Sequence, residues 1–216
     1  MEYHALITEV QGLSRNGMAD KWTWGLEASG DFSVRSLRNI MQQKTFQKLE
    51  SSSEWNRWSP IKVNFLIWRL VMDRLPTMVN LAKRNIQVGS LMCKLCGESE
   101  ETSEHLFVSC GLTQSIWDFV GSWCRLYGFF LFDVKDVLGY HRMTRGTKEW
   151  KKVVYTIIQT TIWCIWRARN NATFNGKQPL ARNLKEEIRV LGYLWVKNRA
   201  RFTELGKNGA ILSYYV

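Results

Sequence analysis

The sequence predicts a mainly α-helical protein with a small amino-terminal β-hairpin and a basic helical segment at its carboxyl end. Three observations support this fold class. Apolar residues recur at helical spacing from Pro60 onward, strand-like alternation is confined to a short stretch around Trp22, and basic residues are concentrated in the last third of the chain. At 216 residues the chain is long enough to bury a core.

Residues 21–33 are expected to form the hairpin, because apolar and polar residues alternate up to a turn of small and polar residues at 28–31. Ser33 then caps a helix with one apolar face. A polar stretch, residues 42–54, follows as a plausible linker. The apolar face consists of Val34, Leu37, Ile40 and Met41.

The clearest amphipathic helix starts at Ser59-Pro60, with Ser as the cap and Pro in the first turn. Pro76 ends it, and Thr77 can cap a second helix over Met78–Arg84. The two helices are expected to pack as a helical hairpin. The apolar stripe of the first helix is formed by Val63, Leu66, Ile67, Leu70 and Val71.

Three further helices are expected toward the carboxyl end. Residues 112–126 form the first, and two longer helices cover 150–170 and 184–202, the last being basic on its outer face. Between them, residues 127–147 show a weaker pattern with three glycines, which indicates a connection.

One motif carries chemistry: Cys93, Cys96, His105 and Cys110, with the spacing Cys-x2-Cys-x8-His-x4-Cys. Thiolate and imidazole are the donors that Zn²⁺ prefers, and four protein ligands leave no position for a reactive water. We therefore predict one structural Zn²⁺ ion in a zinc-stapled helical domain. The alternative is that the cysteines are ordinary buried thiols and that His105 lies on the surface.

The sequence also favours a soluble, intracellular protein. Its first residues lack a secretory signal, and its most apolar stretch is too short and too polar to cross a membrane. In a reducing compartment five cysteines are metal ligands or core thiols rather than disulfides. No membrane partner and no small-molecule substrate are expected, and the sequence identifies no protein partner.

The net charge of +11 is unevenly distributed, with 12 Lys and Arg against 3 Asp and Glu in residues 151–216. Segregated positive charge favours a polyanionic partner, RNA or DNA, although a solvated basic face is the alternative. The metal loop, residues 93–104, is acidic and should repel phosphate, so the contact is expected elsewhere. The candidate nucleic-acid-binding residues are Arg167, Arg169, Lys185, Arg189, Lys197, Arg199 and Arg201.

Several blocks of the chain together resemble a known family. FSVRSL (32–37), W.RWSPIKVNFLIWRLVMDRLPT (55–77), CKLCGESEETSEHLFVSC (93–110) and Ile116-Trp117 resemble the zinc-binding domain after the reverse transcriptase of plant LINE-type retrotransposons. The resemblance implies a zinc site at the four ligand residues and an origin in the carboxyl-terminal part of a retroelement polyprotein. We assign an amino-terminal extension (1–19), this zinc-binding domain (20–125), a connection (126–147) and a basic helical region (148–216).

Catalysis is not expected of this chain. Polymerases and RNase H enzymes hold two metal ions between clustered carboxylates. This chain has no Asp-Asp pair and its six aspartates are scattered, while Glu186 and Glu187 are adjacent on a helix and point in different directions. The sequence therefore predicts a non-catalytic zinc-binding module that associates with RNA or DNA through basic helices. The alternative is a structural or protein-interaction fragment, an inactive retrotransposon remnant that does not bind nucleic acid.

Overall fold

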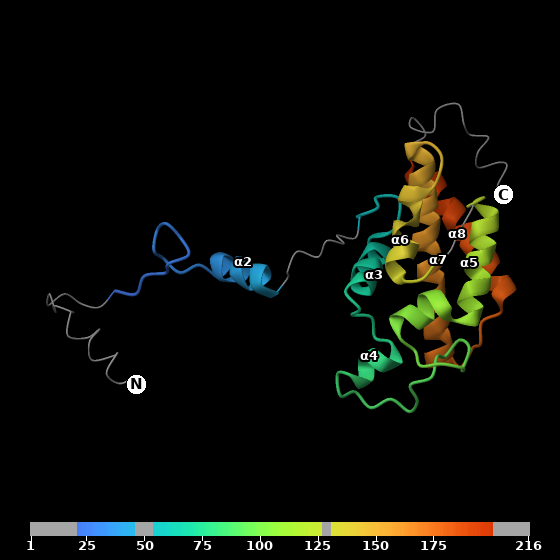
Figure 1. Ribbon diagram of the computed structural model, residues 1–216, viewed down its shortest axis with the longest axis horizontal. Helices are drawn as coiled ribbons and strands as arrows, with labels where there is room; N and C mark the ends of the chain where they lie inside the picture. Colours follow the sequence, from blue (N-terminus) through green and yellow to red (C-terminus); the bar gives the residue numbers. More distant parts are fainter. Residues whose placement is uncertain (1–20, 46–53, 127–130, 201–216) are drawn as a thin grey trace. The chain divides into compact units, whose positions relative to one another are not determined.

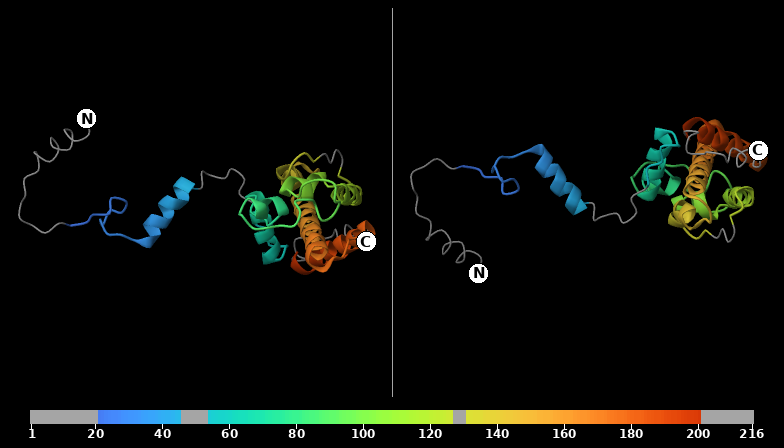
Figure 2. Two further views of the ribbon diagram at one scale, coloured as in Figure 1. Left: turned by 90° about the horizontal axis from the view of Figure 1, so that it is seen from below. Right: turned by 90° about the horizontal axis from the view of Figure 1, so that it is seen from above.

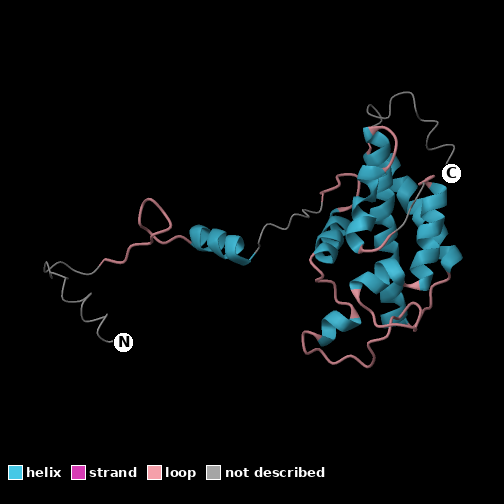
Figure 3. Ribbon diagram, in the orientation of Figure 1, coloured by secondary structure: helices cyan, strands magenta, loops and turns pink. Residues whose placement is uncertain are grey.

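The computed structural model describes residues 21–45, 54–126 and 131–200. The chain divides into two compact units, residues 1–52 and 53–216, and each unit is described by itself. The predicted mainly helical fold class is confirmed: the described residues form helices joined by loops, and no sheet is found among them (Figure 3). None of the described helices combines the length and the apolar character that a membrane crossing requires.

In the first unit, residues 21–33 form turns instead of the predicted β-hairpin. One backbone hydrogen bond, 2.7 Å from the Trp24 N–H to the Gly30 carbonyl oxygen, closes the turn, and Gly30 adopts a left-handed φ of 73°. Trp22 is 97% exposed, so no buried face supports strand pairing here. Helix α2 (Val34–Thr45) follows with the predicted cap, because the Ser33 hydroxyl accepts a hydrogen bond from the Ser36 N–H at 3.0 Å.

The second unit is a bundle of helices (Figure 1). Its predicted helices are present, with ends shifted by a few residues, and one further helix lies in the stretch predicted as a connection. The helices are α3 (Ile61–Val71), α4 (Met78–Ala82), the π-helix η1 (His105–Ser109), α5 (Gly111–Trp123), α6 (Val134–Met143), α7 (Lys148–Asn175) and α8 (Ala181–Arg199).

Helix α7 is the centre of this bundle. Helices α3, α5, α6 and α8 all contact it, and Figures 1 and 2 show it running through the middle of the unit. Sixteen of its 28 residues are buried, on more than one face, as expected for a helix surrounded by others. Its core side chains include Val154, Ile158, Ile162 and Ile165, each at 0% exposure.

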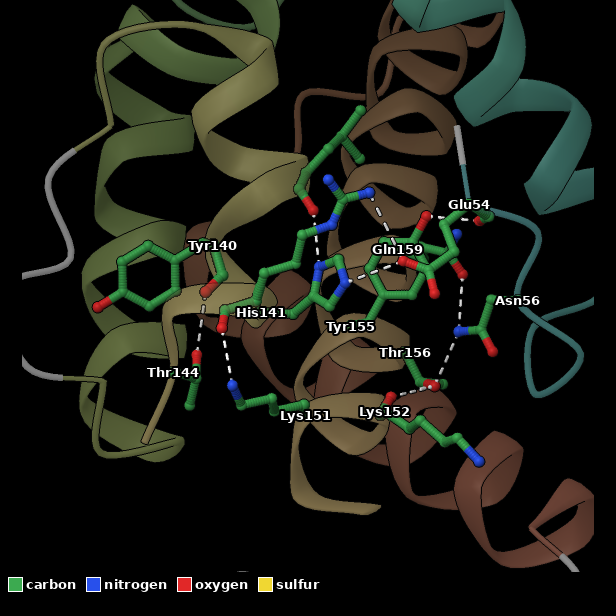
Figure 4. A network of polar contacts seen from close by, with 12 residues as sticks. Glu54, Asn56, Tyr140, His141, Thr144, Lys151, Lys152, Tyr155, Thr156 and Gln159 are labelled. Atoms are coloured by element: carbon green, nitrogen blue, oxygen red, sulfur yellow. Dashed lines mark hydrogen bonds and ion pairs between the residues drawn. The ribbon is translucent and has the colours of Figure 1, made fainter. Parts of the chain in front are cut away.

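The segment that precedes α3 is connected to helix α7 by a network of polar contacts (Figure 4). The Asn56 amide donates hydrogen bonds to Thr156 Oγ1 and Gln159 Oε1, both at 3.0 Å, and the Tyr155 hydroxyl donates to the Glu54 carbonyl oxygen at 2.7 Å. From α6, the His141 ring lies 3.4 Å from the Glu54 carboxylate. Because all of these side chains except that of Glu54 are buried, the network fixes where α3 starts.

Helix α6 is the element that the sequence analysis missed. It begins at a capping box in which the Asp133 side chain accepts from the Asp136 N–H at 2.7 Å and the Asp136 carboxylate accepts from the Asp133 N–H at 3.3 Å. Buried Val134 and Val137 anchor it in the core. Gly139, read as a loop residue, lies inside the helix, where packing outweighs its poor helix propensity.

Candidate metal centre

The four predicted ligand residues come together at one point of the second unit. Their donor atoms all lie within 4.8 Å of one another, so the group could hold one metal ion. Cys93 and Cys96 belong to the loop after α4, His105 opens η1, and Cys110 lies at the junction of η1 and α5.

A tight turn brings the first two cysteines together. The Gly97 N–H donates to the Cys93 carbonyl oxygen at 2.8 Å, and the Glu98 N–H lies 3.5 Å from Cys96 Sγ. Gly97 has a φ of 75°, a left-handed backbone conformation that residues other than glycine rarely adopt. The Cys93 N–H bonds to the Ser99 carbonyl oxygen at 2.7 Å, so the loop folds back on itself before it reaches His105.

His105 is held by the helix that it begins. Its N–H donates to Thr102 Oγ1 at 2.9 Å, and its carbonyl oxygen accepts from the Cys110 N–H at 2.7 Å. That five-residue spacing is the hydrogen bond of a π-helix, which is frequent at functional sites. It places the third and fourth ligands one wide turn apart.

The two nitrogens of the His105 ring have different surroundings. Nε2 lies 3.2 Å from Cys96 Sγ, inside the cluster, whereas Nδ1 lies 3.4 Å from Ser109 Oγ. A metal-binding histidine commonly donates its second ring N–H to a neighbouring oxygen, which fixes the tautomer. Nε2 is therefore the nitrogen placed to bind a metal, and Ser109, which the sequence analysis missed, is placed to orient the ring.

Cys110 is the ligand best prepared to be a thiolate. The Cys93 thiol donates to it, and the backbone N–H groups of Thr113 and Leu112 at the start of α5 point toward it, so its pKa falls to about 5. The same hydrogen bond and burial raise the pKa of Cys93, because that thiol keeps the proton. A cation bound among the sulfurs would replace this shared proton.

The site is closed by burial as well as by its ligand set. Cys93 is 2% exposed and Cys110 is fully buried, whereas Cys96 and His105 are partly accessible. Four protein donors complete a tetrahedral shell and leave no place for substrate or an activated water. The geometry therefore fits a structural metal site.

A buried ion pair connects the metal loop to the rest of the helical bundle. Arg169 on α7 is 2% exposed and donates to Glu101 Oε1 from Nε at 3.0 Å and from Nη2 at 2.6 Å, while Glu101 is fully buried. The Glu101 carboxylate also accepts from the Met78 N–H at 3.0 Å and faces the Lys94 N–H at 3.4 Å. The pair thus joins the metal loop to α4 and α7.

This burial corrects the interpretation of Arg169 as a nucleic-acid contact. Its guanidinium is enclosed and neutralised by Glu101, so it is not presented to a phosphate. The sequence pattern of α7 could have predicted this burial. Arg169 follows buried Ile165 and Trp166 by four and three residues, so it lies on the same buried face of the helix. Its partner Glu101 could not be found from spacing alone.

The other predicted cations are spread over α7 and α8, and several have partners. Arg167 pairs with Glu187 at 2.6 Å and Arg189 lies 3.5 Å from Glu186, while Arg199 donates to the Ser59 carbonyl oxygen at 3.2 Å. The remaining contacts are with aromatic rings: Lys185 and Arg189 lie over Phe119, and Lys197 lies over Tyr193. Arg201 lies outside the described residues.

Comparison with protein families agrees with this geometry. Residues 32–117 match the family described as zinc-binding in reverse transcriptase, and all four ligand residues lie within the match. That family is an accessory zinc-binding domain and not the catalytic part of a reverse transcriptase. Neither the curated proteins nor the solved structures gave a significant match. Residues 32–117 of this chain are therefore similar to the zinc-binding domain of reverse transcriptases.

Proposed function

We propose that the second unit is a zinc-stabilised accessory module whose metal ion is structural. The observation that carries this proposal is the convergence of three thiols and one imidazole, with all donor atoms within 4.8 Å of one another. Three sulfurs and one nitrogen form a ligand set that selects Zn²⁺ over harder cations such as Mg²⁺ or Ca²⁺. Residues 97–100 of the metal loop are exposed, and the loop has few apolar side chains to bury, so the ion would supply much of its order.

Native mass spectrometry of the full chain tests this proposal. The expected result is one Zn²⁺ per chain, lost when Cys93 and Cys96 are replaced by serine. Cys124→Ala is the matched control, because Cys124 is as buried as Cys93 but has no place in the cluster. A chain that carries no zinc after folding in its presence would overturn the proposal.

We further propose that the module is non-catalytic and descends from the carboxyl-terminal part of a plant LINE-type retrotransposon. The match to an accessory zinc-binding family supports the first part. The sequence blocks around the metal ligands support the second. Nucleotide incorporation by the purified chain on a primed RNA template would contradict a non-catalytic role.

Association with RNA or DNA is the function that the charge supports best. The chain carries a net charge of +11, and the second unit exposes cations on α3, directly after α4 and on α8. Binding should weaken steeply between about 50 mM and about 200 mM salt, because cations that contact phosphates release counterions. A filter-binding titration of the zinc-loaded chain at these two concentrations measures this. No binding at the lower concentration would favour a structural or protein-interaction fragment instead.

A further inference from the structure

A large hollow in the second unit lies beside the metal loop, between α3, α4 and the carboxyl-terminal half of α7. We call it the aromatic groove. It has a volume of about 1010 Å³, at the upper limit of small-molecule sites. Its wall residues include Lys62, Phe65, Trp68, Arg69, Trp163 and Phe174.

The charge of the groove has one sign. Lys62 and Arg69 enter from α3 and Lys94 enters from the metal loop, and none of the described residues that line the groove is Asp or Glu. Lys62, Arg69 and Lys94 form no ion pair with a carboxylate in the described ranges. Arg169 lies in the wall, but Glu101 neutralises it. The free positive charge is complementary to a polyanion.

The aromatic side chains of the groove are unusually exposed. Phe65 is 52% exposed, Trp68 is 44% exposed and Phe174 is 76% exposed, although each has a large apolar surface. Trp163 is partly exposed too, and the Lys62 ammonium lies 4.7 Å from its ring centroid. Clustered aromatic surface that stays in water marks a binding site, and flat rings beside cations are the arrangement on which unpaired bases stack.

From these observations we infer that the aromatic groove binds single-stranded nucleic acid, with phosphates at Lys62, Arg69 and Lys94 and bases on Trp68 and its neighbouring rings. This inference rests on the proposed association with RNA or DNA, and it places the main contact with nucleic acid on α3 instead of α8. Duplexes fit less well, because their bases are already stacked on one another and cannot reach the rings.

The groove also gives the metal site a second role. Lys94 lies between the ligands Cys93 and Cys96, so the metal-bound turn sets the position of this cation at the groove. Two of the four acidic residues that made the metal loop look repulsive have partners within the protein. Glu101 pairs with buried Arg169, and the Glu104 carboxylate accepts from the Val134 N–H at 2.9 Å. The repulsion expected from the sequence is therefore reduced on this side.

The test compares two charge-reversal variants of the zinc-loaded full chain, using a fluorescent oligouridine of about 12 nucleotides as the probe. K62E/R69E changes exposed residues of the groove, and K135E/R182E makes the same charge change at exposed residues of α6 and α8 outside it. We expect K62E/R69E to weaken binding at least about tenfold and to reduce the salt slope by about 1.4, from two lost phosphate contacts. K135E/R182E should bind nearly as the wild type does.

The stacking component is tested in parallel. Trp68→Ala should weaken binding about tenfold, whereas Phe132→Ala, which removes an aromatic ring 86% exposed and outside the groove, should have little effect. Oligouridine and oligothymidine distinguish RNA from DNA, a duplex of equal length should compete poorly, and so should polyglutamate. Circular dichroism and zinc content verify that each variant is folded.

The outcomes separate the two proposals. If the wild type binds and K62E/R69E binds as well as K135E/R182E, the groove is not the site, although association stands. Equal competition by duplex or polyglutamate would also overturn the inference, since it would show recognition of charge alone. If the wild type binds none of the probes, the proposed association itself is wrong.

Discussion

Arg169 of α7 donates two hydrogen bonds to a single carboxylate oxygen of Glu101, and both side chains are enclosed, at 2% and 0% exposure. Arg169 also donates to the Pro76 carbonyl oxygen at 3.0 Å, just before α4 begins. One buried ion pair therefore connects the central helix, the start of α4 and the loop that carries two metal ligands.

Arg169→Met is expected to lower the free energy of unfolding by about 3–5 kcal/mol, because it leaves the Glu101 carboxylate buried without a counter-charge. The double variant E101Q/R169M should recover a large part of this loss, since both charges are then gone. Urea denaturation of the zinc-loaded chain measures both effects.

The exposed pair of Arg167 and Glu187 supplies the control for the buried pair. Its side chains are 47% and 35% exposed, so Arg167→Met should cost no more than about 1 kcal/mol. Equal costs at positions 167 and 169 would contradict the structural role assigned to the buried pair.

Gly97→Ala is expected to weaken zinc binding about tenfold, because a Cβ strains the left-handed backbone (φ 75°) of the metal-loop turn by about 1–2 kcal/mol. No atom lies within 4 Å of the added Cβ, so backbone strain and not a clash causes the effect. Gly111→Ala is the control, since that site at the start of α5 is equally open and has no positive φ. Competition with a zinc chelator measures both affinities, and equal affinities would refute the turn's requirement for glycine.

His141 should make the second unit less stable in mild acid. Burial lowers the pKa of His141 below its usual 6.5, despite the nearby Glu54 carboxylate. As the pH falls below about 6.5, the unfolded chain takes up a proton that the folded chain does not, so stability is lost. The unfolding free energy of the wild type should therefore drop more than that of His141→Gln between about pH 7.5 and pH 5.5. Parallel pH profiles would show that His141 does not titrate in this way.

The elements that could be predicted well from the sequence are those marked by residues close together in the chain, such as caps and apolar stripes. Thr77 caps α4, accepting from the Asn80 N–H at 3.3 Å, and the apolar stripe from Val63 to Leu70 is buried on α3. The four metal ligands were also predictable, because their spacing and residue types reflect the donor preferences of the ion. Helix α6 had a weaker signal, the pair Asp133 and Asp136, which three nearby glycines obscured.

What the sequence could not predict depends on residues far apart in the chain. Glu101 and Arg169 are 68 positions apart, and only the fold shows that one neutralises the other. The aromatic groove likewise brings Lys62 on α3 against Trp163 on α7. The basic face of one helix and a tryptophan of another therefore line the same groove. Such pairings follow from packing, which periodicity does not encode.

X-ray absorption spectroscopy at the zinc edge tests the central claim most directly. The account predicts a four-coordinate site with three sulfurs at about 2.3 Å and one nitrogen at about 2.0–2.1 Å. His105→Cys should convert it to four sulfurs, whereas Cys124→Ala should leave it unchanged. A shell that contains a water oxygen, or fewer than three sulfurs, would contradict a closed structural site at Cys93, Cys96, His105 and Cys110.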